Sequence, residues 1–519
     1  MKKSLFICLL FITSVLLFGC NTQSAENTGT SPTESKSEDT KTLNLALFWL
    51  DPNIEPTEGW NGWTLSRLGI GESLVQYDEN MELKPVIAES WEQVDETTTV
   101  FQIRDGVKFH NGNPVDAEAA KKSIERALQI SDRDDVKFPV ESMTAEGQVL
   151  TIKTEKPFAT LVNNLADPVF TIVDTTAADS KDFKYKPVAT GAFQVVKFTP
   201  DVGLTLHKHE EHWSGAIGVD VVNVKYIQDA STRSMALQSG EIDFATQLGA
   251  KDLSLFENNK DFNVQKGPNL RIFLLRLNME KPYMKSLEFR QALSYGMDKE
   301  TYATKIVNGI PAKGPFNELL SFGHKGEDTY GYNPEKANEL LDQAGFVDTN
   351  GDGIREADGE NIVLKFVSRT NHGSDANNIG TAMQAQYKEI GIGVEVIQVE
   401  NYEDMAKSGN FDLIWERWTS APTADAQYFL EASFTTGSAG NHGKYSNEQL
   451  DEIITQLSNT MDKASRDQLG MDGAKILMED VSSLFLYYQE GTVVTRKNVE
   501  GVHRYISELY YIDERVKVN

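Results

Sequence analysis

Cysteine is scarce in this sequence, which contains only Cys8 and Cys20 among its 519 residues. Cys8 lies inside an N-terminal hydrophobic stretch that we expect to be removed, so the mature chain would keep Cys20 and form no internal disulfide. A secreted chain of this size has a large enough core to do without such bridges. The remaining thiol therefore makes most sense as an attachment site.

Long hydrophobic runs are also lacking, because no segment after residue 40 has the roughly eighteen consecutive apolar residues of a membrane-spanning helix. Residues 5–18 follow Lys2 and Lys3 and have the length of a secretory signal sequence. They run into LFGC at 17–20, which resembles the lipoprotein box in which the cysteine is acylated. We expect a signal peptide at 1–19, lipidation at Cys20 and a flexible polar tether at 20–41. An ordinary signal peptide with an incidental cysteine is the alternative.

Positive charge is in short supply, since 50 basic residues face 77 acidic ones and the net charge is −27. A field of this sign repels nucleic acid and anionic lipid headgroups, so neither class of partner is expected. The net charge does not fix the sign of a small ligand, because a local site can carry either charge. About 480 residues remain after the tether, which is enough for two or three domains.

Catalytic signatures are missing as well. The chain has no Gly-x-Ser-x-Gly, Cys-x-x-Cys or His-Glu-x-x-His motif and no phosphate-binding loop of the Gly-x-x-x-x-Gly-Lys-Ser/Thr type. We therefore expect a protein that is not an enzyme and does not hydrolyse ATP. Carboxylate pairs are too common among 77 acidic residues to identify a glycosidase, so a secreted hydrolase is a distant alternative.

Hydrophobic periodicity predicts a large α/β body. Period-two alternation or short apolar runs predict strands at 42–48, 98–103, 149–153, 204–207, 221–227, 363–367 and 394–399. Helical spacing and capping residues predict helices at 65–75, 115–129, 232–239, 287–297, 334–344 and around 379–389. The last of these lies between two strands, which is typical of a parallel sheet.

Several short motifs follow one another in an order that resembles the peptide/nickel solute-binding proteins, family 5 of the bacterial extracellular solute-binding proteins. They are KP at 84–85, AESW at 88–91, RDGV at 104–107, HNGNPVDA at 110–117, TGAF at 190–193, LQSGEID at 237–243, RQALSY at 290–295, the run 332–345, and YSN at 445–447 with Asp451. The resemblance covers nearly all of residues 42–519. Each motif alone is weak, but the ordered set is specific.

This resemblance implies a periplasmic-binding-protein-like clamp of two α/β lobes around a hinge, with an extra inserted domain. The expected boundaries are lobe I at about 42–80, 185–270 and 480–519, the extra domain at about 81–184, and lobe II at about 271–479. Such a clamp closes on its ligand, which the membrane partner can sense.

The resemblance also implies a role and a location. Family members of this kind serve ABC importers and deliver a small ligand to the permease and ATPase subunits. We expect a monomer outside the cytoplasm, lipid-anchored to the outer face of a cell membrane of the Gram-positive type. An oligopeptide- or dipeptide-binding protein, for peptide uptake or pheromone sensing, is the alternative.

The segment 411–434 bears on the ligand. Peptide-binding relatives usually carry an aspartate just after the tryptophan, whereas Trp418 is followed by TSAP and no acid appears before Asp425. This run is closer to the nickel-chelate branch, so a nickel or other metal chelate is favoured and a short peptide is close behind. By analogy the expected ligand contacts are Trp60, Asn61, Trp63, Arg133, Arg417, Trp418 and Asp425. Guanidinium groups hold carboxylates and indole faces pack flat ligands, although the indoles could instead serve interdomain packing.

Metal-ligand candidates are few. The resemblance places His442, in a glycine-rich loop, near the branch's metal-ligating histidine, with a plain loop histidine as the alternative. We expect a structural role for His207, His209 and His212, although their clustering also admits a metal site. The acidic run with Asp348, Asn350 and Asp352 begins like a calcium loop, but Gly359 stands where the bidentate glutamate belongs. It reads as an ordinary turn, and no cofactor is expected to be required.

Overall fold

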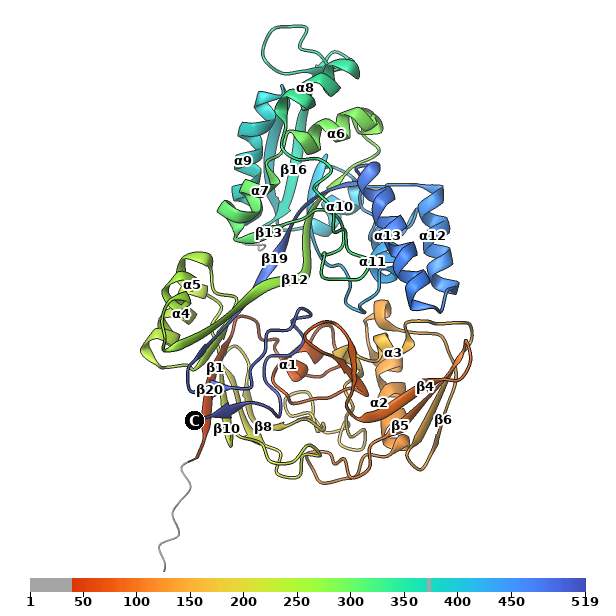
Figure 1. The fold of residues 1–519 in the computed structure, drawn as a ribbon, viewed down its shortest axis with the longest axis vertical. Helices are drawn as coiled ribbons and strands as arrows, with labels where there is room; N and C mark the ends of the chain where they lie inside the picture. Colours follow the sequence, from red (N-terminus) through yellow and green to blue (C-terminus); the bar gives the residue numbers. More distant parts are fainter. Residues whose placement is uncertain (1–39, 371–374) are drawn as a thin grey trace, which may run out of the picture. The chain divides into compact units, whose positions relative to one another are not determined.

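The computed structural model describes residues 40–370 and 375–519 (Figure 1). The predicted signal peptide, Cys20 and nearly all of the predicted tether lie outside the described residues. Within these two ranges no helix has both the length and the apolar character needed to cross a membrane.

The predicted α/β architecture is confirmed, and its main element is a mixed sheet of eleven strands. The strand order is β17 (Gly393–Val399), β16 (Val363–Arg369), β18 (Leu413–Thr419), β12 (Phe262–Leu277), β19 (Ser483–Arg496), β11 (Phe244–Thr246), β1 (Thr42–Leu47), β10 (Val221–Tyr226), β9 (Gly203–Lys208) and β8 (Phe193–Thr199), with β13 (Gly309–Pro311) also on β19. The predicted strand–helix–strand unit is present, because α9 (Asp375–Glu389) joins the parallel strands β16 and β17.

Two long strands connect the halves of this sheet. Strands β12 and β19 pair antiparallel from Phe262 opposite Arg496 to Arg276 opposite Ser483, and Figure 1 shows both running from beside β1 towards β16. Their register breaks between Pro268 and Ile272, next to the pair Gly267–Gly491. A bulge beside two opposed glycines weakens the ladder and eases bending. We therefore expect the two-lobe clamp to bend at this strand pair.

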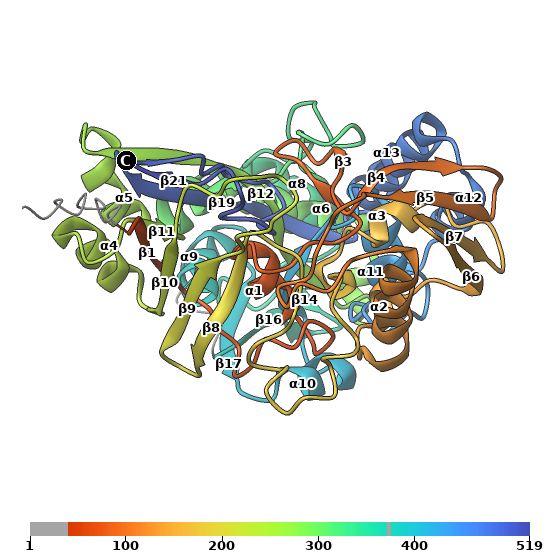
Figure 2. The same ribbon diagram turned by 90° about the horizontal axis from the view of Figure 1, so that it is seen from below.

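A second, four-stranded sheet lies within the expected extra domain. Its order is β4 (Ala88–Gln93), β5 (Thr98–Ile103), β7 (Val149–Thr154) and β6 (Val140–Glu146), and Figure 2 shows it apart from β8, β9 and β10. Helix α2 (Ala117–Ile130) begins at Asp116, whose side chain accepts a hydrogen bond from the Ala119 N–H at 2.8 Å. Its buried face packs against β6 and β7.

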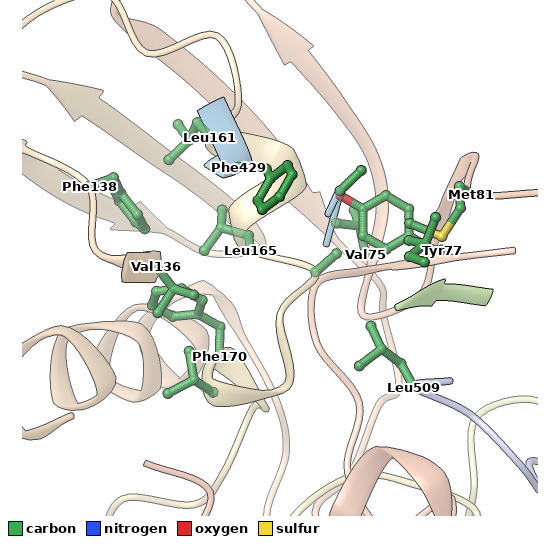
Figure 3. Close-up of a cluster of buried hydrophobic side chains, with 14 of the residues drawn as sticks. Val75, Tyr77, Met81, Val136, Phe138, Leu161, Leu165, Phe170, Phe429 and Leu509 are labelled. Carbon is green, nitrogen blue, oxygen red and sulfur yellow. The ribbon is translucent and has the colours of Figure 1, made fainter. Parts of the chain in front are cut away.

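A hydrophobic cluster joins this part of the chain to residues far along the sequence. Phe429 of α11 (Gln427–Phe434) lies beside Leu161 and Leu165 of the α3 region (α3, Leu161–Asn164), as Figure 3 shows. The same cluster includes Leu509 near the C-terminus. Contacts such as these group residues 40–519 into one unit, and the three-part boundaries remain a prediction.

Helices α6 (Leu287–Tyr295), α8 (Pro334–Gln343), α12 (Glu448–Asn459) and α13 (Lys463–Glu479) lie with the second half of the main sheet, whereas α4 (Ala230–Ser239) and α5 (Ala250–Glu257) pack beside β11 and β12 (Figure 1). Helix α8 has its proline at the first turn, after the Asn333 cap, as predicted.

The helix predicted at 65–75 is wrong in extent. Helix α1 covers only Gly62–Arg67, and β2 (Val75–Tyr77) follows. The backbone turns at Gly69, whose φ is +60° and whose missing Cβ makes room for the Ile512 carbonyl oxygen, 2.9 Å from where a Cβ would lie. A left-handed glycine ends a helix in this way. Hydrophobic spacing alone could not reveal this close approach.

Candidate functional site

The main candidate site is a cavity of about 290 Å³ beside the break in β12. Three separate parts of the chain form its walls: the segment after β1 with helix α1, the strand β12, and the strand β18 with helix α11. Its lining residues are Trp49, Asp51, Trp60, Trp63, Thr64, Arg67, Arg271, Arg417, Trp418, Thr419 and Tyr428. The cavity therefore collects four indoles, a phenol and three guanidinium groups in a small volume.

Aromatic rings make the apolar walls. Trp60 and Trp63 meet edge to face with their centroids 5.5 Å apart. From a later part of the chain, the Trp418 ring packs on the Phe429 ring with the two centroids 5.6 Å apart. The Trp60 side chain remains 42 % exposed, so its face is available to a ligand. Indole faces of this kind suit flat rings and cations.

Arg417 is the cation that the fold leaves open to a ligand. It lies on β18 opposite Phe273 of β12, is exposed, and makes no side-chain hydrogen bond or ion pair with any residue in the described ranges. Desolvation by the surrounding walls and repulsion from Arg271 lower its pKa to about 10, so it keeps its charge at neutral pH. An unpaired guanidinium in a cavity is a site for a carboxylate.

The other two cavity arginines are held by the protein itself. The Arg67 Nε donates to the Glu508 carbonyl oxygen at 2.9 Å, and the Arg67 guanidinium lies 5.0 Å from the Trp63 ring centroid. Arg271 donates to the Glu508 carboxylate at 3.1 and 3.3 Å.

Asp51 is the acidic residue on the cavity lining. Burial raises the pKa of its carboxyl group, although its hydrogen bond with Trp49 and the charge of Arg67 act in the opposite direction.

Behind Trp418 lies a buried polar network centred on Glu416. Its Oε2 accepts hydrogen bonds from the fully buried Arg276 at 2.7 and 3.2 Å and from the Trp418 Nε1 at 2.9 Å. Its Oε1 lies 2.7 Å from the His442 Nδ1. Burial alone would raise the pKa of Glu416, but the charge of Arg276 and the contact with His442 lower it to about 2. Trp418 lines the cavity, and Glu416 fixes the orientation of its ring by accepting the hydrogen bond from its Nε1–H.

The structure brings together four of the predicted ligand contacts, Trp60, Trp63, Arg417 and Trp418, around this one cavity. Asn61 is not on the lining, because it is buried and donates to the Asn53 Oδ1 at 2.9 Å.

Three other predicted residues also lie off the cavity wall, each held by a partner. Arg133 bonds Asp135 at 2.8 Å, reaches Asp167 at 3.3 Å and lies 3.7 Å above the Trp60 ring, so it supports that ring from behind. Asp425 receives two hydrogen bonds from Arg466, both 2.8 Å long. His442 is half-buried against Glu416 rather than free on its loop.

Sequence reasoning missed Trp49, Asp51, Arg67, Arg271 and Tyr428. An indole and a carboxylate directly after the first strand gave a usable signal, because polar and aromatic groups at the end of a buried strand often face a site. Arg67 on the short helix α1 and Arg271 on the long strand β12 had no sequence signal that pointed to a site.

The other metal-ligand candidates are occupied with structural contacts. His209 and His212 are buried, and His212 bonds Glu72 at 3.2 Å, whereas His207 is exposed. The Asp348 carboxylate accepts the backbone N–H groups of Gly351 and Gly353 at 2.7 and 2.9 Å, as in a plain acidic turn. In the part of the chain that the structure describes, no three His, Cys, Asp or Glu side chains are placed to hold a metal ion.

Comparison with known proteins gives consistent matches. The model of the bacterial extracellular solute-binding proteins, family 5, matches residues 82–441. The nickel-binding protein NikA of Staphylococcus aureus is 27 % identical over 482 residues, covering 92 % of this chain and 94 % of that protein. The glutathione-binding protein GsiB of Pectobacterium atrosepticum is 26 % identical over 458 residues, covering 83 % and 85 %. A crystal structure of NikA from Staphylococcus aureus in complex with Ni(L-His)2 aligns with a TM-score of 0.76 at 26 % identity, covering 92 % of this chain and all of that one.

Proposed function

Because the chain belongs to the bacterial extracellular solute-binding proteins of family 5, and so is a substrate-binding protein of the peptide/nickel class of importer, we propose that its ligand is a metal chelate bearing carboxylate groups. Nickel is the favoured metal and is cargo rather than a resident cofactor. The chain binds and releases this ligand without chemical change, and a membrane permease with its ATPase subunits receives it.

The observation that carries this proposal is the unpaired Arg417 among indole rings. A guanidinium binds a carboxylate through two parallel hydrogen bonds, and the rings of Trp60, Trp63 and Trp418 can pack on the flat parts of a chelator. A bis-amino-acid chelate presents both features at once. The likeness to NikA, whose structure contains Ni(L-His)2, supports the same class of ligand.

His442 adds a second argument for a metal. Its Nδ1 is held by Glu416, so Nε2 is the nitrogen left for coordination. A carboxylate behind an imidazole orients the ring and raises its basicity, which is the usual arrangement around metal-ligating histidines. In this proposal the loop that carries His442 shifts towards the metal when the ligand binds, because His442 is off the cavity wall in the present conformation and belongs to the same predicted lobe as Arg417.

Closure brings the loop after β18 towards the parts of the chain before residue 170. Two contacts already link these regions: the Asn163 Nδ2 donates to the Thr423 carbonyl oxygen at 2.9 Å, and the Tyr428 hydroxyl donates to Asp135 at 3.3 Å. Ligand held by Arg417 on one side and by Trp60 on the other would add to them. The hinge strands allow this motion without breaking the sheet.

A short peptide is the second candidate ligand. GsiB binds glutathione according to its name, and Asp51 offers a carboxylate that could receive an ammonium group. Uptake and pheromone sensing use the same clamp, so both belong to this alternative. Lipid attachment through Cys20, an outer-face location on the cell membrane and a monomeric state complete the proposal.

The test compares Ni(II) plus two equivalents of L-histidine with glutathione, using the purified residues 40–519, by thermal unfolding and calorimetry. Because hydrogen bonds to charged groups contribute about 1.5–3 kcal/mol, we expect Arg417→Gln to weaken binding about ten- to one-hundredfold. Arg369→Gln is the matched control: Arg369 lies on β16, pairs with Glu403 and is not on the cavity lining, but its charge also acts on Arg417, so it tests a nearby charge without a direct contact.

Saturable binding of the nickel complex that Arg417→Gln weakens and Arg369→Gln leaves intact supports the proposal. Binding of glutathione alone selects the peptide alternative. If neither ligand binds, or if the two variants behave alike, the carboxylate role of Arg417 is wrong.

A further inference from the structure

Glu508 lies behind the cavity in the irregular segment between β20 (Val499–Glu500) and β21 (Lys517–Val518). Its side chain is buried, with 7 % of its surface exposed. Its backbone φ is +60°, an uncommon conformation for a residue other than glycine. Such strain persists where the surrounding contacts impose it, and it is concentrated at functional sites.

The contacts that impose this conformation run to the cavity and to the hinge. The carboxylate Oε2 accepts from the Nε and Nη2 of Arg271, and the backbone oxygen accepts from Arg67. The carboxylate Oε1 accepts from the Gln247 Nε2 at 2.8 Å, and the Gln247 Oε1 in turn accepts from Gln489 on the hinge strand β19 at 3.0 Å. One acidic residue thus holds two of the three cavity arginines.

The charges around the cavity can be counted from these contacts. Its lining carries the guanidinium groups of Arg67, Arg271 and Arg417 and the carboxylate of Asp51. Glu508 supplies the second carboxylate, and its field also reaches Arg417, where it opposes the repulsion from Arg271. Among the lining residues and Glu508, three positive and two negative groups leave one net positive charge, which equals the charge on Arg417.

We propose that Glu508 is a specificity-determining positioning residue, which limits the cavity to one excess positive charge and selects against ligands with two or more net negative charges. This inference rests on the proposed binding of carboxylate-bearing chelates and adds to it the charge class of the ligand. Without Glu508, Arg271 would turn its charge to the ligand, and the preference would shift to more negative ligands.

The test uses two probes of the same shape, the EDTA complexes of cobalt(III) and cobalt(II), which carry one and two negative charges. Dissociation constants of both are measured by calorimetry for the purified residues 40–519, and their ratio is the readout. The wild-type chain is expected to favour the cobalt(III) complex. Glu508→Gln should shift the ratio about tenfold towards the cobalt(II) complex, the scale expected for one charge at short range in a partly solvated site.

Arg271→Gln provides the opposite perturbation, because it leaves Glu508 without its cation and should shift the ratio further towards the cobalt(III) complex. Glu356→Gln is the matched control: Glu356 is also 7 % exposed, its carboxylate accepts the backbone N–H of Thr349, and it is not on the cavity lining. A purely structural role of Glu508 would weaken both complexes alike and leave the ratio unchanged.

Opposite shifts in the two variants, with an unchanged ratio in Glu356→Gln, support the role of Glu508. Binding with the same ratio in every variant overturns that role and leaves the proposed function intact. Should Glu508→Gln fail to fold, the ratio in Arg271→Gln decides, since no shift there also overturns it. If no variant binds either complex, while the nickel–histidine and glutathione titrations are also negative, both the inference and the proposed function are wrong.

Discussion

Removing the charge of Glu416 should destabilise the fold severely, because this carboxylate is the only ion-pair partner of Arg276 within the described residues. Glu416→Gln keeps the shape of the side chain but leaves the guanidinium of Arg276, which is fully buried, facing only neutral groups such as the hydroxyls of Ser433 and Ser483. Breaking a buried pair by removing one partner costs about 3–5 kcal/mol. The pKa of Glu416, lowered from 4.5 to about 2, gives about 3 kcal/mol independently.

The assay is urea unfolding at pH 7, followed by circular dichroism and by tryptophan fluorescence, with Glu356→Gln as the isosteric control. Within the described residues the carboxylate of Glu356 accepts one hydrogen bond, from the Thr349 N–H, so its replacement should cost about 1 kcal/mol. The fluorescence should also change in Glu416→Gln, because the Nε1–H of Trp418 would then donate to a neutral amide oxygen instead of a carboxylate. A loss in Glu416→Gln no larger than that in the control would refute the reasoning, since the buried cation would then not depend on this carboxylate.

Two further predictions concern stability elsewhere. Burial, followed by repulsion from neighbouring histidines, lowers the pKa of His110 from 6.5 to about 3, so its neutral form is favoured in the fold. The stability it contributes is complete above pH 6.5 and is lost as the pH falls towards 3, by about 2 kcal/mol at pH 5; a pH series of urea midpoints should show a shallower decline in His110→Gln. At Gly203, φ is +147° and an added Cβ would lie 1.9 Å from the Val224 carbonyl oxygen. Gly203→Ala should therefore cost about 2 kcal/mol or more in the same assay, and an unchanged midpoint would contradict this.

The four predicted contacts that line the cavity, Trp60, Trp63, Arg417 and Trp418, came from the family resemblance rather than from local patterns. Trp63 lies on helix α1, three residues after Trp60, and Arg417 and Trp418 are neighbours on β18, where adjacent side chains normally point to opposite faces. Local patterns were sufficient for the β16–α9–β17 unit, whose hydrophobic periods are unbroken. Patterns within about ten residues are the part of a fold that sequence expresses most directly.

Pairing between distant residues explains what sequence could not show. Asp425 looks like a free charge in the sequence, but the fold gives it Arg466, 41 residues further on, as its partner. Arg133 pairs with Asp135, two residues away, and the fold adds the distant Asp167. A charge is available to a ligand only when folding leaves it unpaired, and that depends on contacts far along the chain.

The position of the cavity relative to the hinge connects binding with motion. Arg271 lies inside the irregular stretch of β12, opposite Thr419 of β18, and Arg417 lies opposite Phe273, which forms the second β12–β19 pair after the break. A ligand that draws Arg417 towards the indoles of the first segment therefore acts on β12 where its ladder is weakest. Glu508 holds Arg271 at the same point and reaches β19 through Gln247. If the proposed role of Glu508 is right, we expect ligand charge and hinge angle to be coupled through this one guanidinium, because an anion that competes with Glu508 for Arg271 would remove a contact beside the break in β12.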